Sequence, residues 1–509
     1  MAKSHQVLPS SGPAREALRE KGQFWTPEWV ADAMVAYVMG VDTDHVFDPA
    51  VGAGAFFAAA KRISARLGRR VKLLGTEIDS TALKESRGAG LSDRDLANVQ
   101  IRDFVLDGPE KRFSAIVANP PYIRHHRLDG TTKEKLQFIA KSLIGKRLDG
   151  RTGYHVFFLI KALNSLEKRG RLAFIMPADT CEGVFAHLLW KWILGTYRLD
   201  AVVTFSHEAS PFPNVDTNAL IFMISANEPG STFAWYRCSQ AGTSALREWV
   251  EEQFPVAQNG SIVAVQRRVA EALETGLSRP PQERHEGPVL GDFVRVMRGI
   301  ATGDNNFFFM TRAEAVSRGL PLEFLVRAVG RTRDVEGSEL TEEQIEGLEQ
   351  KGRPSYLLSL DGRQVADFPV EVRRYLRQGE EKGVAVRPLI RQRSPWYKME
   401  RRRIPPFLFA YLGRRNARFV RNRANAVPLT GFLCVYPKKE DREIIEKLWA
   451  VLNHPDTIAN LSRVAKSYGS GAIKVEPRAL ERTPISEAAL LGVGLVHERF
   501  ERQAELAFH

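Results

Sequence analysis

The sequence predicts an α/β protein in which a doubly wound, Rossmann-like sheet is followed by a second domain of mixed α+β structure. Two observations predict the sheet. Short apolar strands alternate with helical segments between residues 28 and 225, and a polar side chain follows the end of each of the first four strands. This alternation is typical of mainly parallel sheets, whose ligands bind beyond the carboxyl ends of the strands. A third observation, the loss of the alternation after residue 226, predicts the second domain.

The elements of the sheet follow in a regular order. Thr26-Pro27 supplies an N-cap and a first-turn proline for a helix over 28–39. Strands are expected at 45–47, 71–75, 99–102, 113–118, 171–176, 200–205 and 219–225, with helices at 55–67, 81–87, 153–166 and 184–192. The strand-end residues are Asp48, Glu77, Asp103 and Asn119. We therefore expect these four side chains to gather at one edge of the sheet.

The chain is expected to divide into four parts. Residues 1–20 form a polar leader, and residues 21–243 form the domain with the sheet. Residues 244–284 form a helical connector, with helices at 244–252 and 261–273. The second domain is expected at 285–509, where short strands, turns and aromatic residues dominate.

Composition narrows the class of protein. The 509 residues include 73 Lys and Arg against 60 Asp and Glu, a net charge of +13, which favours a polyanionic partner such as nucleic acid. The three cysteines are widely spaced and match neither a disulfide framework nor a metal site, as expected in a reducing cytoplasm. No apolar stretch approaches the ~20 residues that a membrane helix needs.

A glycine loop follows the first strand. In Asp48-Pro-Ala-Val-Gly-Ala-Gly-Ala-Phe56, Gly52 and Gly54 allow a tight turn and close approach of a ligand to the backbone. The loop lacks the Lys-Ser/Thr of a nucleotide P-loop, and the acidic Asp48 disfavours a phosphate. A carboxylate at this place suits a cation or an amine donor, such as the ammonium and sulfonium of S-adenosylmethionine.

Two further strand ends suit a nucleoside. A carboxylate at Glu77, 29 residues after Asp48, can accept hydrogen bonds from both hydroxyls of a ribose. Asp103 can accept a hydrogen bond from the amino group of adenine, and Phe104 can lie on the face of its ring. Each residue taken alone also fits a strand-end side chain that faces water.

Asn119-Pro-Pro-Tyr122 directly follows the apolar run 115–118 and carries the functional prediction. Two prolines fix φ and remove two backbone donors, which leaves carbonyl oxygens as acceptors in a rigid turn. The Asn119 side-chain oxygen and the Pro120 carbonyl match the two hydrogens of a planar amino group. Tyr122 offers a flat surface on which a base can stack.

On these residues the chain resembles the gamma class of S-adenosylmethionine-dependent adenine DNA methyltransferases, of the type II restriction–modification kind. Gly22-Gln-Phe-Trp-Thr-Pro27, the glycine loop and Asn119–Tyr122 follow in the order of that class. The resemblance implies that Thr26, Asp48, Ala50 and Gly52 line the methionine part of the cofactor. It also implies that Glu77 and Ile78 contact the ribose and adenine, that Asp103 and Phe104 contact the adenine, and that Phe212 is a second aromatic residue facing the target base.

The same resemblance assigns the second domain to target recognition. Segments 294–303 and 305–309 look like its beginning, and 467–474 looks like a segment near its end. Between Arg387 and Arg423 twelve basic residues are opposed only by Glu400 and are interleaved with aromatic residues, a composition that suits phosphate contacts. The predicted DNA contacts are Arg391, Arg393, Arg401, Arg402, Arg403, Arg414 and Arg415. A solvated basic face over core aromatic residues is the alternative.

The implied reaction is direct methyl transfer to the exocyclic amino nitrogen, N6, of an adenine rotated out of double-stranded DNA, with no covalent intermediate and no metal. A monomer is expected, and a separate restriction endonuclease acting on the same site is left open. Three alternatives remain: enzymes that methylate RNA amino groups, enzymes that methylate protein glutamine, and a non-catalytic DNA specificity protein on the same fold.

Overall fold

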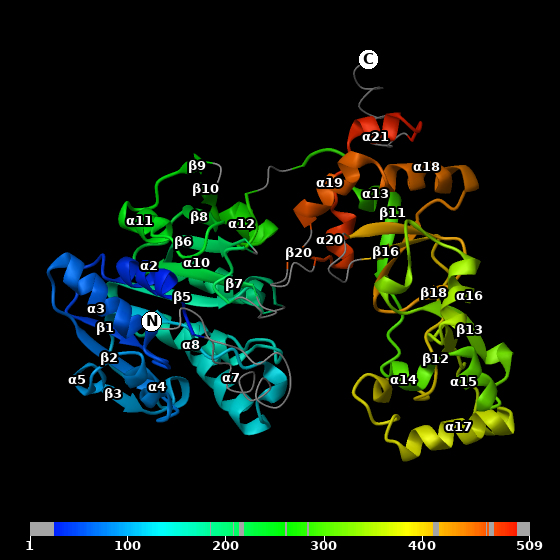
Figure 1. Cartoon of the computed structure of the whole chain (residues 1–509), viewed down its shortest axis with the longest axis horizontal. Helices are drawn as coiled ribbons and strands as arrows, with labels where there is room; N and C mark the ends of the chain where they lie inside the picture. Colours follow the sequence, from blue (N-terminus) through cyan, green and yellow to red (C-terminus); the bar gives the residue numbers. More distant parts are fainter. Residues whose placement is uncertain are drawn as a thin grey trace. The chain divides into compact units, whose positions relative to one another are not determined.

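In the computed structural model, the described residues are 25–183, 185–206, 208–212, 218–259, 262–281, 285–410, 417–464, 466–467 and 473–495. The chain divides into two compact units, unit 1 up to residue 283 and unit 2 from residue 284 (Figure 1). The expected leader, 1–20, and Arg414 and Arg415 lie outside the described residues.

A ten-stranded sheet forms the centre of unit 1. Its order is β3-β2-β1-β4-β5-β7-β6-β8-β10-β9, and the pairs from β3 to β5 are all parallel. β7 runs antiparallel between β5 and β6. The strands are β1 (His45–Asp48), β2 (Lys72–Glu77), β3 (Val99–Ile101), β4 (Phe113–Ala118), β5 (Leu166–Pro177), β6 (Arg198–Phe205), β7 (Ala219–Ser225), β8 (Thr232–Cys238), β9 (Ala257–Asn259) and β10 (Ile262–Arg268).

Helices cover both faces of this sheet, so the predicted doubly wound α/β class is confirmed (Figure 1). Successive residues of β4 point to opposite faces: Ala115 and Val117 join one core cluster, and Ile116 and Ala118 join the other. The first core includes α2 (Glu28–Val38), α3 (Ala55–Leu67), α5 (Asp93–Leu96) and α11 (Ala245–Glu251). The second includes α6 (Phe104–Asp107), α7 (Gly130–Ile144), α8 (Tyr154–Asn164), α10 (Ala186–Thr196) and α12 (Val269–Thr275). Two short helices, α4 (Ala82–Gly88) and α9 (Asp179–Glu182), complete the unit.

The prediction of a helix over 261–273 is wrong. Residues 262–268 form β10, which pairs antiparallel with β8, and only the residues from Val269 onward are helical, in α12. The Val263 and Val265 positions favour a strand when an open sheet edge is available, and β8 supplies that edge. The expected helical connector is therefore partly an extension of the sheet.

Unit 2 contains two larger sheets, with orders β11-β19-β16-β17-β14 and β12-β15-β13-β18, and a small β20-β21 pair. Its strands are β11 (Val294–Arg298), β12 (Phe309–Met310), β13 (Leu325–Val329), β14 (Glu339–Leu340), β15 (Tyr356–Leu358), β16 (Phe407–Ala410), β17 (Arg418–Asn422), β18 (Val427–Pro428), β19 (Phe432–Pro437), β20 (Lys466–Ser467) and β21 (Ile473–Lys474). Its helices are α13 (Leu290–Phe293), α14 (Asn305–Phe308), α15 (Arg312–Ser317), α16 (Glu342–Gln350), α17 (Val370–Glu381), α18 (Arg442–Leu452), α19 (Pro455–Val464), α20 (Pro477–Glu481) and α21 (Glu487–Leu491).

Candidate active site

A cavity of about 340 Å³ lies at the carboxyl ends of β1, β2 and β4, where a parallel sheet places its ligands. Eight of the residues predicted from the sequence line it: Thr26, Ala50, Gly52, Glu77, Ile78, Asp103, Phe104 and Asn119. Asp48 lies fully buried at the end of β1, directly before the lining residues 49–53. The sheet thus brings the four strand-end polar residues to one place.

The glycine loop between β1 and α3 takes a left-handed backbone that its glycines permit. Gly52 has φ of 52° and Gly54 has φ of 80°, so a side chain at either position would be strained. The Gly52 amide donates to Glu77 Oε2 at 2.8 Å, and the Asp79 amide donates to Glu77 Oε1 at 2.9 Å. Glu77 therefore links the glycine loop to the end of β2 while lining the cavity.

Asp48 is a buried carboxyl group with one unmatched oxygen. Its Oδ1 accepts a hydrogen bond from the Ala50 amide at 2.9 Å, whereas Oδ2 has no hydrogen-bond partner among the described residues. Burial raises the pKa of Asp48 to about 8, and the nearby Glu77 charge adds to this shift. A positively charged group that reaches Oδ2 would supply the missing partner and stabilise the carboxylate.

Asp103 begins α6 as its N-cap and also contacts a neighbouring helix. Its Oδ1 accepts the amides of Val105 and Leu106, and its Oδ2 accepts the Tyr154 hydroxyl at 2.6 Å. Burial, and then this hydrogen bond, raise the pKa of Tyr154 above its ordinary value, which keeps the phenol a donor. Phe104 is buried yet lines the cavity, so its ring forms part of the wall.

Asn119 follows β4, and its side chain is oriented by Thr26. The Asn119 amide nitrogen donates to Thr26 Oγ1 at 3.1 Å, and both residues line the cavity. Because the carboxamide is planar, this bond turns its oxygen away from Thr26. Pro120 is buried, and Pro121 and Ile123 continue the wall.

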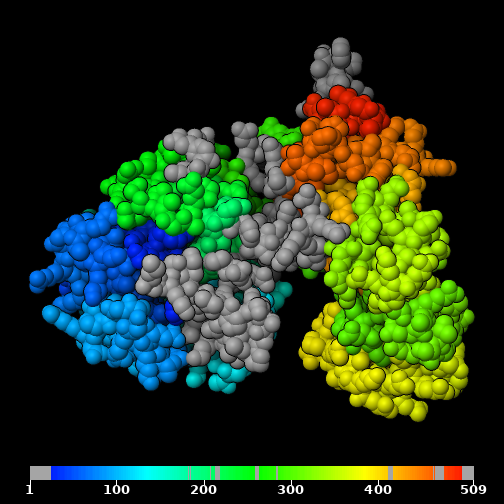
Figure 2. Space-filling view, viewed as in Figure 1, coloured from blue at the N-terminus to red at the C-terminus, as the bar shows by residue number. Residues whose placement is uncertain are grey.

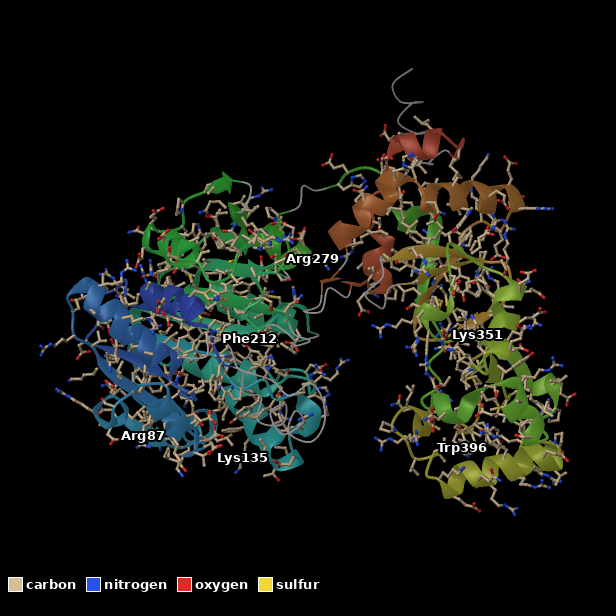
Figure 3. The ribbon with its side chains drawn as sticks, viewed as in Figure 1. Arg87, Lys135, Phe212, Arg279, Lys351 and Trp396 are labelled. Atoms are coloured by element: carbon tan, nitrogen blue, oxygen red, sulfur yellow. The ribbon has the colours of Figure 1, made fainter. Side chains whose placement is uncertain are left out.

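The two predicted stacking residues lie outside the cavity lining. The Tyr122 hydroxyl donates to the backbone carbonyl of Ile175 in β5 at 3.0 Å, and its ring meets His155 edge-on at 6.0 Å. Phe212 is 4% exposed and belongs to a core cluster of unit 1, where Figure 3 labels it. The structure therefore anchors Tyr122 beside Asn119 and buries Phe212.

Comparison with known families covers both units. Residues 11–232 match the N-6 DNA methylase family, and residues 274–503 match the C-terminal domain of the type II methyltransferase M.Eco57I. Over 483 residues the chain is 23% identical to the type II methyltransferase M.AccI of Acinetobacter calcoaceticus, covering 94% of this chain and 87% of that protein. The chain belongs to the adenine-specific DNA methyltransferases. It is also 24% identical to the type II methyltransferase M.XamI of Xanthomonas campestris pv. amaranthicola, covering 91% of this chain and 85% of the relative.

Two solved structures share the fold of this adenine methyltransferase across most of its length. The type IIL restriction–modification enzyme MmeI, in complex with DNA, has a TM-score of 0.53 at 14% identity, covering 93% of this chain and 64% of its own. The DrdV–DNA complex has a TM-score of 0.52 at 12% identity, covering 94% and 57%. The methyltransferase thus spans less than two thirds of each of these solved chains.

The basic residues of the methyltransferase's second unit fall into two groups. Arg393 donates to the carbonyls of Ala301 and Thr302 at 2.7 and 2.8 Å and lies over the Phe308 ring. Arg402 donates to the Arg298 carbonyl. These two arginines hold the loop after β11 and the end of β11, whereas Arg391, Arg401 and Arg403 are exposed. Arg401 donates to the Ser359 carbonyl, and Arg403 pairs with Glu440.

Several cavity residues of the methyltransferase were not predicted. Trp25, Asp79, Arg102, Tyr154 and Phe158 also line the cavity. Trp25 and Asp79 are neighbours of the predicted Thr26 and Glu77, so a wider reading of those motifs would have found them. Tyr154 lies 51 positions from its partner Asp103, and nothing in the local sequence signals that contact. A search among the described residues finds no helix long and apolar enough to cross a bilayer.

Proposed function

We propose that this enzyme transfers a methyl group from S-adenosylmethionine to N6 of an adenine that has been rotated out of double-stranded DNA. The observation that carries the proposal is the position of Asn119. Its side chain donates to Thr26, and both residues line the cavity at the carboxyl ends of the parallel strands. The bond to Thr26 turns the carboxamide oxygen of Asn119 away from Thr26. The two family matches extend over both units and support DNA as the substrate.

The cavity suits S-adenosylmethionine in charge and shape. Asp48, with its unmatched buried oxygen, would accept the ammonium group, and Glu77 would accept the ribose hydroxyls with its remaining lone pairs. Ile78, which is 69% exposed at the rim, would cover one face of the adenine. The bound cofactor supplies an electrophilic methyl group on its sulfonium.

Asn119 and the Pro120 carbonyl would activate the target nitrogen. The lone pair of an adenine amino group is conjugated with the ring, which makes the nitrogen a poor nucleophile. Two acceptors on its hydrogens pull the nitrogen toward a tetrahedral shape and aim its lone pair at the methyl carbon. In one in-line displacement the bond between N6 and the methyl carbon would form as the carbon–sulfur bond breaks, the donor would leave as a neutral thioether, and the methylated amino group would lose one proton to solvent. Positioning and electrostatics lower the barrier.

Tyr122 would hold the rotated base. Rotating a base out of the duplex costs a few kcal/mol, and stacking on an aromatic ring returns about 1–3 kcal/mol. The Tyr122 hydroxyl bond to Ile175 favours one position of the ring, which reduces the entropy lost when the base arrives. For Phe212 the same role would require a movement out of its core position.

The family matches also support a biological setting. The two long relatives are named type II methyltransferases, and we propose that unit 2 recognises the target sequence while a monomer modifies each site. A separate restriction endonuclease that cuts the unmodified site would be its counterpart.

Asn119→Ala is the decisive test of the catalytic role. We expect methyl transfer to DNA to fall about a hundredfold to a thousandfold, as when a catalytic hydrogen-bonding group is removed. Cofactor affinity, measured by calorimetry, should be retained. Asn98→Ala, at an exposed asparagine of the same unit, is the matched control and should leave both quantities unchanged.

Two outcomes would contradict the proposal. Equal loss of cofactor binding and transfer in Asn119→Ala would assign Asn119 to the cofactor site instead. If labelled methyl groups entered RNA or protein rather than DNA, the substrate would be RNA or protein, and the amino-group chemistry would be the same.

A further inference from the structure

A basic excursion follows the Asn119–Tyr122 motif and returns to the same cavity. The Ile123 carbonyl accepts the Tyr154 amide at 2.9 Å, so residues 124–153 leave and rejoin the site at one backbone hydrogen bond. Ile123 and Tyr154 both line the cavity. The excursion is therefore connected to the cavity at both of its ends, with α7 between them in the chain.

The excursion is folded onto unit 1. The Asp129 side chain caps α7 by accepting the Thr132 amide at 2.8 Å, and Gly145 ends the helix with φ of 76°. Leu136 and Ala140 are buried in the core cluster that also contains α8. The buried side of α7 fixes which side chains its opposite side presents to solvent.

The excursion carries an unusual share of the positive charge. Residues 124–151 contain eight Lys and Arg against three Asp and Glu, a net charge of +5 out of +13 for all 509 residues. Two of the three acids have local partners, because Asp129 caps α7 and Asp149 pairs with Arg151. Within the described part of the chain, Lys135, Lys141, Lys146 and Arg147 make no ion pair, and all four are exposed.

An exposed aromatic side chain lies among these charges. Phe138 is 70% exposed, and Lys135 and Lys141 precede and follow it by three residues, so all three share the solvent side of α7. Figure 3 labels Lys135 at the lower rim of unit 1, and the cyan surface of α7 reaches the same rim in Figure 2. Cations around an accessible ring are typical of surfaces that follow a nucleic-acid strand.

We propose that this α7 surface, formed by Lys135, Phe138, Lys141, Lys146 and Arg147, binds the sugar–phosphate backbone of the DNA strand next to the target base. The proposal rests on the proposed function and adds a DNA contact within unit 1 to those expected in unit 2. Lysines on a fixed helix neutralise phosphates without reading sequence, and such contacts hold the duplex against unit 1. Phe138 packs against the strand between them.

The double variant Lys135→Glu/Lys141→Glu tests the surface. The probe is a short fluorescent duplex cut from genomic DNA that the wild-type enzyme methylates. We expect the dissociation constant to rise at least about tenfold, and the slope of its logarithm against the logarithm of salt concentration to decrease by about two. Cofactor affinity and thermal unfolding should stay unchanged.

Arg69→Glu/Arg70→Glu is the matched control. It makes the same charge change at exposed positions of unit 1. These residues precede β2, at the amino ends of the parallel strands, whereas the cavity lies at their carboxyl ends. Phe138→Ala removes no charge and should still weaken binding of the duplex about fivefold or more. This variant keeps the test valid if the charge reversal disturbs folding.

The outcomes separate this proposal from the function on which it rests. If the wild-type enzyme neither binds nor methylates DNA, the proposed function fails. If it does both, and the α7 variants match the Arg69/Arg70 control, only the α7 surface is excluded. Loss of affinity for an RNA duplex with unchanged affinity for DNA would also overturn the proposal.

Discussion

Thr26 and Asn119, 93 positions apart, are joined by one hydrogen bond that selects the orientation of the Asn119 amide. The Thr26 hydroxyl accepts from the nitrogen end of the carboxamide, and only the other end, the oxygen, can accept hydrogens from the target nitrogen. The resemblance to the gamma class implies a cofactor contact for Thr26. The geometry adds a positioning role in the same residue.

Thr26→Val should lower the rate of methyl transfer about tenfold to a hundredfold. The variant keeps the shape of the side chain but removes the hydrogen bond that Thr26 accepts from Asn119, a loss of about 1–3 kcal/mol. Thr26→Ser should restore most of the rate, and single-turnover kinetics at saturating cofactor measure the effect. If the variant changed only the cofactor affinity, Thr26 would have no positioning role and would act only as a cofactor contact.

Asp48 should release a proton when S-adenosylmethionine binds at pH 7. Burial raises its pKa to about 8, so the carboxyl group is mostly protonated at pH 7 in the empty cavity, and an ammonium group favours the carboxylate. Calorimetry in buffers of different ionisation enthalpy should show up to about one proton released, decreasing as the pH rises above 8. Asp48→Asn should abolish this dependence, and buffer-independent heats in the wild-type enzyme would contradict the assignment.

The same shift affects the stability of the empty enzyme. Native Asp48 keeps a proton that the unfolded chain has lost between about pH 4 and pH 8. Its contribution to the free energy of unfolding is therefore complete below about pH 4 and is lost as the pH rises through 8.

Site residues were predictable from the sequence where a residue type that suits the chemistry stands at the end of a predicted strand. Glu77, Asp103 and Asn119 line one cavity because each stands at or just beyond the carboxyl end of a parallel strand. The contact between Asp103 and Tyr154 was not predictable, because it depends on how α8 packs against α6. The buried position of Phe212 likewise depends on packing that its local motif does not specify.

At the scale of elements, the basic segment of unit 2 combines structural and exposed arginines. Arg393 holds the backbone after β11 through two carbonyls and the Phe308 ring, whereas Arg391 is exposed two residues away. Composition alone assigned both to DNA, because a count of charges cannot distinguish a guanidinium that binds carbonyls from one that faces solvent.

Arg393→Ala should therefore affect stability, and Arg391→Ala should affect DNA binding. Arg393→Ala should lower the free energy of unfolding by about 1–3 kcal/mol, since two carbonyls lose a charged donor. Arg391→Ala should change it by less than about 0.5 kcal/mol and should reduce the salt slope of DNA binding by about one. Chemical denaturation and fluorescence titration measure the two quantities, and equal destabilisation by both variants would contradict this division.

Helices and strands were predictable where the local pattern of apolar residues alone determines the structure. The helix at 55–67 and the strand at 113–118 have the predicted bounds. Residues 262–268 were predicted as helix because Val and Ala positions in this segment suit either structure, and β8 decides the outcome through long-range pairing.

At the scale of the whole molecule, the two units should respond separately to the cofactor. All the described residues that line the cavity belong to unit 1, so binding stabilises that unit by about 2.7 kcal/mol at a hundred times the dissociation constant. Scanning calorimetry with S-adenosylmethionine should raise one of two transitions and leave the other in place. A single transition that moves as a whole would mean that the units unfold together.

The bond between Ile123 and Tyr154 has a consequence for how this enzyme can vary. A segment whose ends meet at one fixed junction can be lengthened or exchanged at a low entropic cost, about 0.6 kcal/mol for each doubling of a flexible loop. A graft from a relative can thus replace the stretch around α7 while the junction stays intact, provided that it keeps apolar residues at the positions of Leu136 and Ala140, which are buried in the core. The affinity for DNA would then vary independently of the rate of methyl transfer.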